Sequence, residues 1–383
     1  MYARIIHKRT LQQVGLLLAV GIACLALLRW PEAAANGVSR GLAVCGEVIV
    51  PSLFPFLVLT GVFTRSGLAG RVGKRLEKLT GRLFHLPGCC GAALLVGMIG
   101  GYPAGGVAVR DLLERDEITK TQAKRLLRFC VGGGPAFIIG AVGARLLGSS
   151  YKGVLLYIAH LLAALLIGLL TRGRGEDLGN EERHLSKPPY TPKKAFVEAV
   201  GSACGAVVTM CGFVMAFSAF LTLSDASGFS SVMMYPFTLF GKQTGLSALY
   251  PAFWEVSCGS VAVAGSAADG VWLAFLLGAT LGWGGVSVHC QLGGILSEYN
   301  VLGKDYFLAR GWHALLGGGL SALLFRFLPM PADTAIATSV SVSTFPVVRP
   351  VSVSVAASVA MLLLCGVFLL TAARNDKNRD LHF

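Results

Sequence analysis

Three polar side chains lie within apolar stretches of the sequence. Their position indicates a binding site at membrane depth. Glu255 follows the apolar run LSALYPAFW, and His289 and Gln291 follow the glycine-rich interruption GWGGVS (282–287). A carboxylate within a bilayer is expensive, and such groups usually face a cavity and mark a pathway. Glu255 could bind a cation there, exchange a proton or accept hydrogen bonds from a polar solute. The alternative is that its segment lies at the outer surface and the carboxylate is solvated.

The other candidate polar residues give weaker signals. Because His289 and Gln291 are two positions apart, they do not share a helix face, although in unwound backbone both would reach a cavity. A buried histidine satisfied by a carbonyl is the alternative for His289. His160 and His313 occupy matching late helices and are expected to brace helices rather than to bind. Hydroxyl groups at chain turns and breaks come from Tyr102, Ser257 and Ser287.

The composition predicts an all-α polytopic membrane protein. Of 383 residues, 54% are hydrophobic and 14% are charged, and the mean hydropathy is +0.67. Soluble domains carry about 25% charged residues. The net charge of +13 does not indicate nucleic acid, since the basic residues lie in short segments between apolar runs, as the positive-inside rule predicts. The ten cysteines show no C-x-x-C spacing and are expected to pack as small apolar residues, so no metal or cofactor is predicted.

The stretch LLVGMIGGYPAGGVAV (94–109) is broken in the middle by four glycines and a proline. The apolar part before the break, residues 88–99, makes about 18 Å of helix, little more than half of a core of about 30 Å. Basic segments flank both sides, so the chain is expected to enter the membrane and return as a re-entrant hairpin. The alternative is one kinked helix over 88–110. The tip would hold Gly101, Tyr102, Pro103 and Gly105.

In the first half the predicted order is helix, hairpin, broken helix and helix. The second half of the chain repeats this order. The first half breaks its later helix at GGGP, and the second half has a tip at EVSCGS (255–260) and a break at GWGGVS. Each half would cross the membrane an odd number of times, which predicts an inverted repeat. Paired interruptions of this kind are the best sequence pointer to a transporter site; chance likeness of glycine-rich segments is the alternative. These segments add Gly133, Gly134, Pro135, Gly259 and Gly285 to the candidate site.

The pattern predicts about eight transmembrane helices and two re-entrant hairpins, with both termini cytoplasmic. Residues 11–28 form either an uncleaved signal anchor or a secretory signal with an Ala-x-Ala site. The charged run 110–128 is predicted as one amphipathic surface helix whose Leu112, Leu113, Leu126 and Leu127 rest at the membrane interface. The expected divisions are a signal-anchor helix (1–39), a first repeat (40–171), a charged cytoplasmic linker (172–195), an inverted second repeat (196–329), and an outer loop with a last span and tail (330–383).

Five segments carry a resemblance to a known family. They are PSLFPFLVLTGVF (51–63), GGYPAG (100–105), GGGPAFIIGAVG (132–143), EVSCG (255–259) and WGGVSVHCQ (283–291). Together they resemble the YlbJ-type sporulation integral membrane proteins of the nucleoside-recognition or "Gate" domain group, which is similar to concentrative nucleoside transporters and the ferrous-iron permease.

The resemblance covers roughly residues 40–330. It implies a transporter-like fold in the cytoplasmic membrane of a spore-forming bacterium and a role in spore formation, at its cortex stage. The family has asparagines before its Gly-Pro pair, whereas this chain has Val131, Gly132 and Gly133. A site built on those asparagine side chains is therefore not expected here. The part of the site formed by backbone groups is still expected.

The function expected from these features is a permease that moves a small polar solute by alternating access. A nucleoside-like or peptidoglycan-related solute, coupling to H⁺ or Na⁺, and a homo-oligomer are the partners considered beside the lipid bilayer. The alternative is a membrane scaffold that recruits partners through the basic segments 65–82 and 110–128. No catalytic motif or intramembrane carboxylate pair occurs, so an enzyme is not expected.

Overall fold

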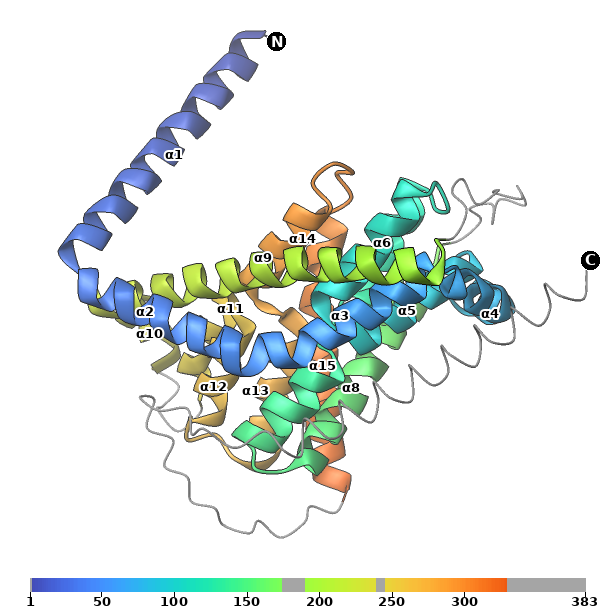
Figure 1. The fold of residues 1–383 in the computed structure, drawn as a ribbon. Helices are drawn as coiled ribbons and strands as arrows, with labels where there is room; N and C mark the ends of the chain where they lie inside the picture. Colours follow the sequence, from blue (N-terminus) through green and yellow to red (C-terminus); the bar gives the residue numbers. More distant parts are fainter. Residues whose placement is uncertain (1, 174–189, 239–244, 329–383) are drawn as a thin grey trace, which may run out of the picture.

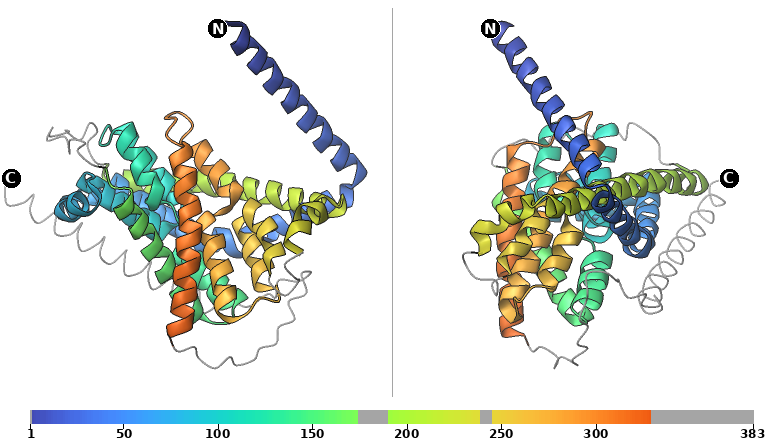
Figure 2. Two further views of the ribbon diagram at one scale, coloured as in Figure 1. Left: turned by 180° about the vertical axis from the view of Figure 1, so that it is seen from behind. Right: turned by 90° about the vertical axis from the view of Figure 1, so that its left-hand side faces the viewer.

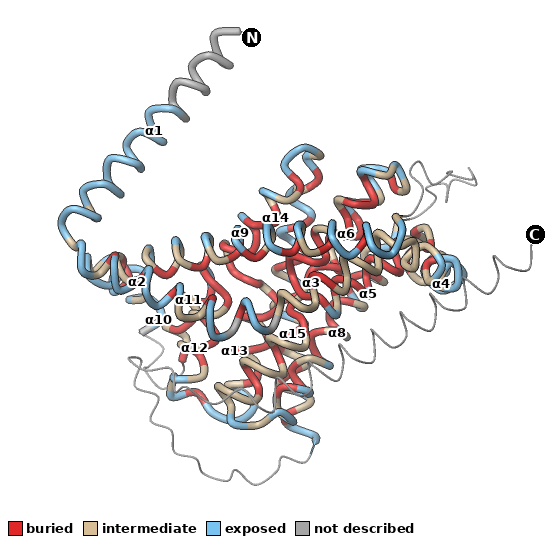
Figure 3. Tube along the Cα trace, in the orientation of Figure 1, coloured by how far each residue is buried: buried red, intermediate tan, exposed pale blue. Residues whose placement is uncertain are grey.

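The computed structural model describes residues 2–173, 190–238 and 245–328, and all regular structure in these ranges is helical (Figure 1). The predicted outer loop, last span and tail, and most of the predicted linker, lie outside the described residues. Helix α1 (Tyr2–Arg29) projects away from the rest, and its main contact is with its neighbour α2. From residue 14 onward its large apolar side chains are exposed, with Leu17 at 72% and Leu28 at 80% (Figure 3). Such a surface suits a helix surrounded by lipid.

The described elements after α1 fall into two series, one on each side of the predicted linker. The first series is α2 (Pro31–Val44), a π-helical turn (Cys45–Ile49), α3 (Val50–Arg65), α4 (Leu68–Phe84), α5 (Gly88–Gly100), α6 (Tyr102–Glu114), α7 (Lys120–Cys130), a π-helix (Ala136–Leu146) and α8 (Ser150–Leu170). The second series is α9 (Pro192–Ala226), α10 (Phe229–Thr238), a short 3₁₀ turn (Leu246–Ala248), α11 (Leu249–Trp254), α12 (Val256–Ala264), α13 (Gly270–Trp283), α14 (Gly285–Ile295) and α15 (Lys304–Phe327).

The leading helices of the two series lie side by side and run in opposite directions (Figures 1 and 2). Gly37 of α2 faces Ala219 of α9, and Gly61 of α3 lies against Ala199, near the other end of α9. Small residues allow two backbones to approach closely within a membrane, where apolar surface alone does not drive helices together. We call this contact the α2–α3/α9 seam.

The seam helices also end in the same way. Gly67 follows α3 and Gly228 follows α9, and both have φ of +77°. A side chain is disfavoured at this left-handed angle, whereas glycine adopts it freely. The segments GVFTRSG (61–67) and LTLSDASG (221–228) therefore close their helices at equivalent glycines.

Three described helices are long and apolar enough to cross a membrane, or up to five if each of two bent pairs is one span. The three are Ser150–Leu170, Pro192–Ala226 and the joined run of α13 and α14, Gly270–Ile295. The bent pairs turn by 98° and 77°. The predicted span 307–328 folds as α15, which is not among them. The chain is thus a helical polytopic membrane protein, and the predicted total of eight crossings stays a prediction.

Both predicted tips fold the chain back on itself. At the first, a Cβ on Gly97 of α5 would lie 3.2 Å from the Cα of Gly105 on α6, so the two helices are antiparallel neighbours around Gly101. At the second, Gly259 of α12 packs directly on Ala252 of α11. A single kinked helix over 88–110 would hold residues 97 and 105 about 12 Å apart. That alternative is therefore wrong.

The prediction of one surface helix over 110–128 is also wrong. The segment divides between α6 and α7, and the Thr119 hydroxyl and Gln122 side chain form a capping box that starts α7. Leu126 and Leu127 are completely buried in the protein. An apolar helix stripe fits a protein core as well as a membrane interface, and here neighbouring helices cover it. Leu112 and Leu113, at 7% and 6% exposure, are buried too.

Candidate functional site

The tip of the first hairpin lies on the first helix break. Helix α7 ends at Cys130, residues 131–134 are not helical, and the π-helix begins at Ala136. A Cβ on Gly134 would lie 3.0 Å from the Ile99 carbonyl oxygen and 3.2 Å from the Cα of Gly101. Glycine at both positions therefore allows the tip and the break to touch through their backbones.

The second half repeats this arrangement. Between α13 and α14 the chain breaks at Gly284 and Gly285, which both have φ of +84°. A Cβ on Gly285 would lie 2.9 Å from the amide nitrogen of Val256 and 3.0 Å from the Cα of Glu255. Each hairpin tip therefore rests on the broken helix of its own half.

Tyr102 connects the first tip to the second break. Its buried hydroxyl donates a hydrogen bond of 2.6 Å to the Leu281 carbonyl oxygen. Its ring also lies beside Gly284, where a Cβ would be 3.2 Å from the Tyr102 Cε1 atom. The tyrosine thus joins elements that are 179 residues apart in the sequence.

Glu255 is 1% exposed and caps a half-helix. Its Oε2 atom accepts a hydrogen bond of 2.7 Å from the amide of Cys258, so the carboxylate closes the N-terminus of α12. A carboxylate in this position satisfies an otherwise unpaired amide and complements the positive end of the helix dipole. The alternative of a solvated surface residue is wrong, and any contact of Glu255 with a solute remains a prediction.

His289 and Gln291 lie within the regular helix α14, so the alternative of unwound backbone is wrong. The helix resumes at Gly285, immediately after the break, so only the first turn of α14 borders it. The Nδ1 atom of His289 pairs with the Tyr306 hydroxyl at 3.0 Å. Gln291 is 5% exposed, and the completely buried Ser287 hydroxyl has no hydrogen-bond partner in the part of the chain that the structure describes.

The remaining predicted residues line the same turns. Pro103 occupies the first turn of α6, and Pro135 precedes the π-helix. Gly105 faces the Cys130 carbonyl oxygen, which would lie 2.5 Å from a Cβ there. Ser257 is half-buried in the first turn of α12. The structure therefore gathers the predicted tips and breaks, but their close contacts are made by backbone more than by polar side chains.

Arg310 is a buried cation that the sequence reasoning missed. It is 1% exposed, and its guanidinium donates to the carbonyl oxygens of Val131 at 2.5 Å and Arg128 at 2.6 Å. These carbonyls end α7, where the negative end of the helix dipole favours a cation. An arginine inside an apolar helix is itself a functional-site signal, so it could have been found.

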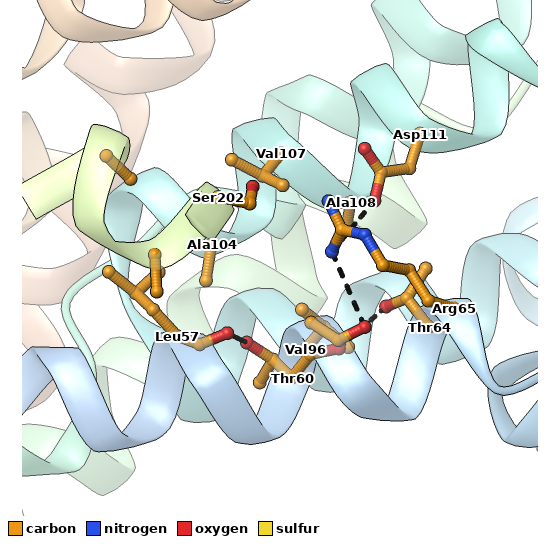
Figure 4. A pocket seen from close by; sticks show the side chains of 13 residues that line it. Leu57, Thr60, Thr64, Arg65, Val96, Ala104, Val107, Ala108, Asp111 and Ser202 are labelled. Atoms are coloured by element: carbon orange, nitrogen blue, oxygen red, sulfur yellow. Dashed lines mark hydrogen bonds and ion pairs between the residues drawn. The ribbon is translucent and has the colours of Figure 1, made fainter. Parts of the chain in front are cut away.

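A pocket of about 20 Å³ lies beside the first hairpin, between α3, α5, α6 and α9 (Figure 4). This volume suits about one water molecule. At one end Arg65 lies 4.0 Å from Asp111, which also pairs with Arg110 at 3.0 Å. None of the predicted site residues lines this pocket. The chamber expected between the two hairpins is therefore not this cavity.

Comparison with known proteins gives one informative relative. No protein-family model matches the chain, and no solved structure matches it. The chain is 30% identical over 332 residues to a protein of Bacillus subtilis (strain 168) described as sporulation integral membrane protein YlbJ. The match covers 80% of each sequence. The chain therefore belongs to the YlbJ family of sporulation integral membrane proteins.

Proposed function

We propose that this protein is a membrane permease that moves a small polar solute by alternating access during spore formation. Membership of the YlbJ family supports the membrane location and the link to sporulation. The transport activity is our inference from the two hairpins and two broken helices. In this proposal the two series of helices form an inverted repeat of the Gate type, with eight crossings and both termini in the cytoplasm.

The observation that carries the proposal is the paired contact of each tip with its own break. Gly101 meets Gly134 in the first half, and Glu255 meets Gly285 in the second. Broken helices placed in corresponding positions of two halves form the substrate sites of many secondary transporters. Non-helical backbone at membrane depth is tolerated only within protein or beside water. A solute site between the halves supplies a reason for both breaks.

The mechanism follows from the half-helix ends. No side chain caps the N-termini of α6 and α14. In this proposal, their first amides hold an electron-rich group of the solute. In one state the first hairpin would close one side of the site, and in the other state the second hairpin would close the opposite side. The Tyr102–Leu281 hydrogen bond would break between the two states.

A second candidate function is a scaffold, and one observation favours it. Helix α4 packs one face on α5 and presents a row of exposed basic side chains on the other. Such a face fits an acidic protein partner or anionic lipid. The exposed basic residues are Arg71, Lys74, Arg75, Lys78 and Arg82.

Complementation of a Bacillus subtilis strain that lacks its YlbJ protein separates the two functions. The chain would be expressed in that strain, and heat-resistant spores would be counted. The permease proposal expects Gly105→Leu and Gly285→Leu to abolish complementation, and charge reversal at Lys74, Arg75 and Lys78 to preserve it. The opposite pattern would establish the scaffold. Membrane abundance of every variant would be checked by immunoblot.

Uptake into proteoliposomes tests transport directly. The probes would be labelled uridine, N-acetylglucosamine and succinate, each with an imposed proton or sodium gradient. We expect at least one probe to enter faster than into protein-free vesicles, and Glu255→Gln to slow its entry. If no probe enters and the two proteins behave alike, the permease proposal loses its support.

A further inference from the structure

The first helix break is held by an imidazole ring from another helix. The amide of Gly133 donates a hydrogen bond of 2.9 Å to the Nε2 atom of His160 on α8. His160 is 3% exposed, and its own carbonyl oxygen pairs with the Nε2 atom of His313 on α15 at 3.1 Å. The break is thus tied to α8, and α8 is tied to the second half.

This hydrogen bond fixes the protonation state of His160. An amide can donate only to a ring nitrogen that has a free lone pair, so Nε2 carries no proton and the proton sits on Nδ1. A doubly protonated imidazolium has no lone pair at either nitrogen. Protonation of His160 therefore removes the acceptor that holds Gly133.

Among the residues that the structure describes, the groups around His160 provide no anion that would stabilise a charged ring. From α15 come His313, whose ring stacks on His160 with centroids 4.3 Å apart, and the buried cation Arg310. Tyr102 of α6 lies close to the first break, since its hydroxyl would be 3.3 Å from a Cβ on Gly133. Cys130 ends α7 next to the break, and α13 contributes no titratable side chain. A proton on His160 and this packed arrangement therefore exclude each other.

In the part of the chain that the structure describes, no histidine ring accepts a hydrogen bond from the backbone of the second break. His313 is the counterpart of His160 in α15, but its backbone carbonyl, not its ring, lies against Gly282 beside that break. The ring points to α8 instead and stacks on His160. His289, which follows the second break, contacts Trp283 edge to face and pairs with the Tyr306 hydroxyl instead. In the described residues, an imidazole therefore accepts a backbone hydrogen bond at the first break and not at the second.

We propose that His160 is the proton site of the permease, whose neutral ring latches the first break at Gly133 and whose protonation releases it. The inference rests on the proposed function and names H⁺ as its coupling ion. A ligand shifts a conformational equilibrium only through different affinities for the two states. The proton meets this condition, because it binds His160 only when the Gly133 bond is broken and the ring has left its packed position.

Hydrogen–deuterium exchange of the full chain in lipid nanodiscs tests this latch without any solute. The readout is exchange at residues 131–137, measured at about pH 8 and about pH 5, on either side of the ordinary imidazole titration near pH 6.5. Each value is divided by that of His160→Gln at the same pH, which cancels the chemical effect of pH on exchange. Glutamine supplies an amide oxygen that accepts from Gly133 and does not titrate.

The latch predicts that this ratio rises about thirtyfold at the lower pH, since the open state then gains roughly tenfold per pH unit below 6.5. His313→Gln should keep the rise, and residues 282–287 at the second break should not show it. A ratio independent of pH, or a rise that is the same at both breaks, would overturn the proposal. Because no solute is used, failure of uptake alone would leave this result standing.

Discussion

His160 stacks on His313 with ring centroids 4.3 Å apart, and the two residues occupy corresponding positions near the middle of α8 and α15. When a residue contacts its own counterpart from the other half, the contact lies on the axis that relates the halves. The same geometry follows from the antiparallel α2–α3/α9 seam. The two features together support the inverted repeat that we propose.

The histidine pair should contribute measurably to stability. His313→Ala removes both the stacked ring and the bond to the His160 carbonyl, so we expect a loss of about 2–4 kcal/mol. His313→Phe keeps the ring but not the hydrogen bond and should lose less, about 1 kcal/mol. Thermal unfolding of the purified protein in detergent gives both values. Equal losses for the two variants would show that stacking contributes nothing.

The first hairpin should not tolerate a methyl group at its inner face. A Cβ on Gly105 would lie 2.5 Å from the Cys130 carbonyl oxygen, so Gly105→Ala should destabilise the protein by about 1–3 kcal/mol. Gly293 of α14 has nothing within 4 Å of a Cβ and serves as the matched control. Gly293→Ala should be neutral or stabilising by up to about 1 kcal/mol. Thermal unfolding that ranks the two variants the other way would contradict the hairpin packing.

Arg310 should be required for the end of α7. Arg310→Met leaves the carbonyl oxygens of Arg128 and Val131 without their charged donor, and each such bond contributes about 1.5–3 kcal/mol. Arg310→Lys keeps the charge but cannot match the forked donor geometry, so an intermediate loss is expected. The measurement is the unfolding midpoint of each variant in the same detergent. If the methionine variant matched the wild type, Arg310 would have no role in holding α7.

The capping role of Glu255 and the role of its charge can be tested separately. Glu255→Ala removes the acceptor for the Cys258 amide and should cost about 1 kcal/mol of stability. Glu255→Gln keeps an oxygen acceptor and should be more stable than the alanine variant. Stability would be measured by thermal unfolding and function by spore counts. A glutamine variant that is stable but fails to complement assigns a role to the charge beyond capping.

The inverted repeat predicts opposite sides of the membrane for α4 and α10, which hold matching places in the two series. In a cysteine-free background, Val232→Cys of α10, 65% exposed, should react with a membrane-impermeant maleimide from outside. Arg71→Cys of α4 should react only after the membrane is permeabilised. Labelling of both positions from one side would rule out the inversion.

The interruptions of the chain were predictable because glycine and proline act locally. GGYPAGG, GGGP and GWGGVS each disturb helical hydrogen bonding or allow positive φ, and the turns and breaks fall there. What each surface packs against was not predictable. The Leu126–Leu127 stripe has the same pattern whether it meets lipid or protein, and the position of His289 depends on where α14 resumes. The sequence alone could have identified Arg310 as an arginine within an apolar helix. Its carbonyl partners depend on how α15 packs against α7.

The seam between α2–α3 and α9 also constrains how the chain is made. The Cys45 thiol and the Cys211 carbonyl that meet across it are 166 residues apart. The ribosome therefore delivers every element of the first half before α9 can cover the small-residue stripe of α2 and α3. Until then that stripe faces lipid, an insertion factor or a neighbouring nascent chain. Packing of α9 on α2 and α3 is therefore a late step of biogenesis.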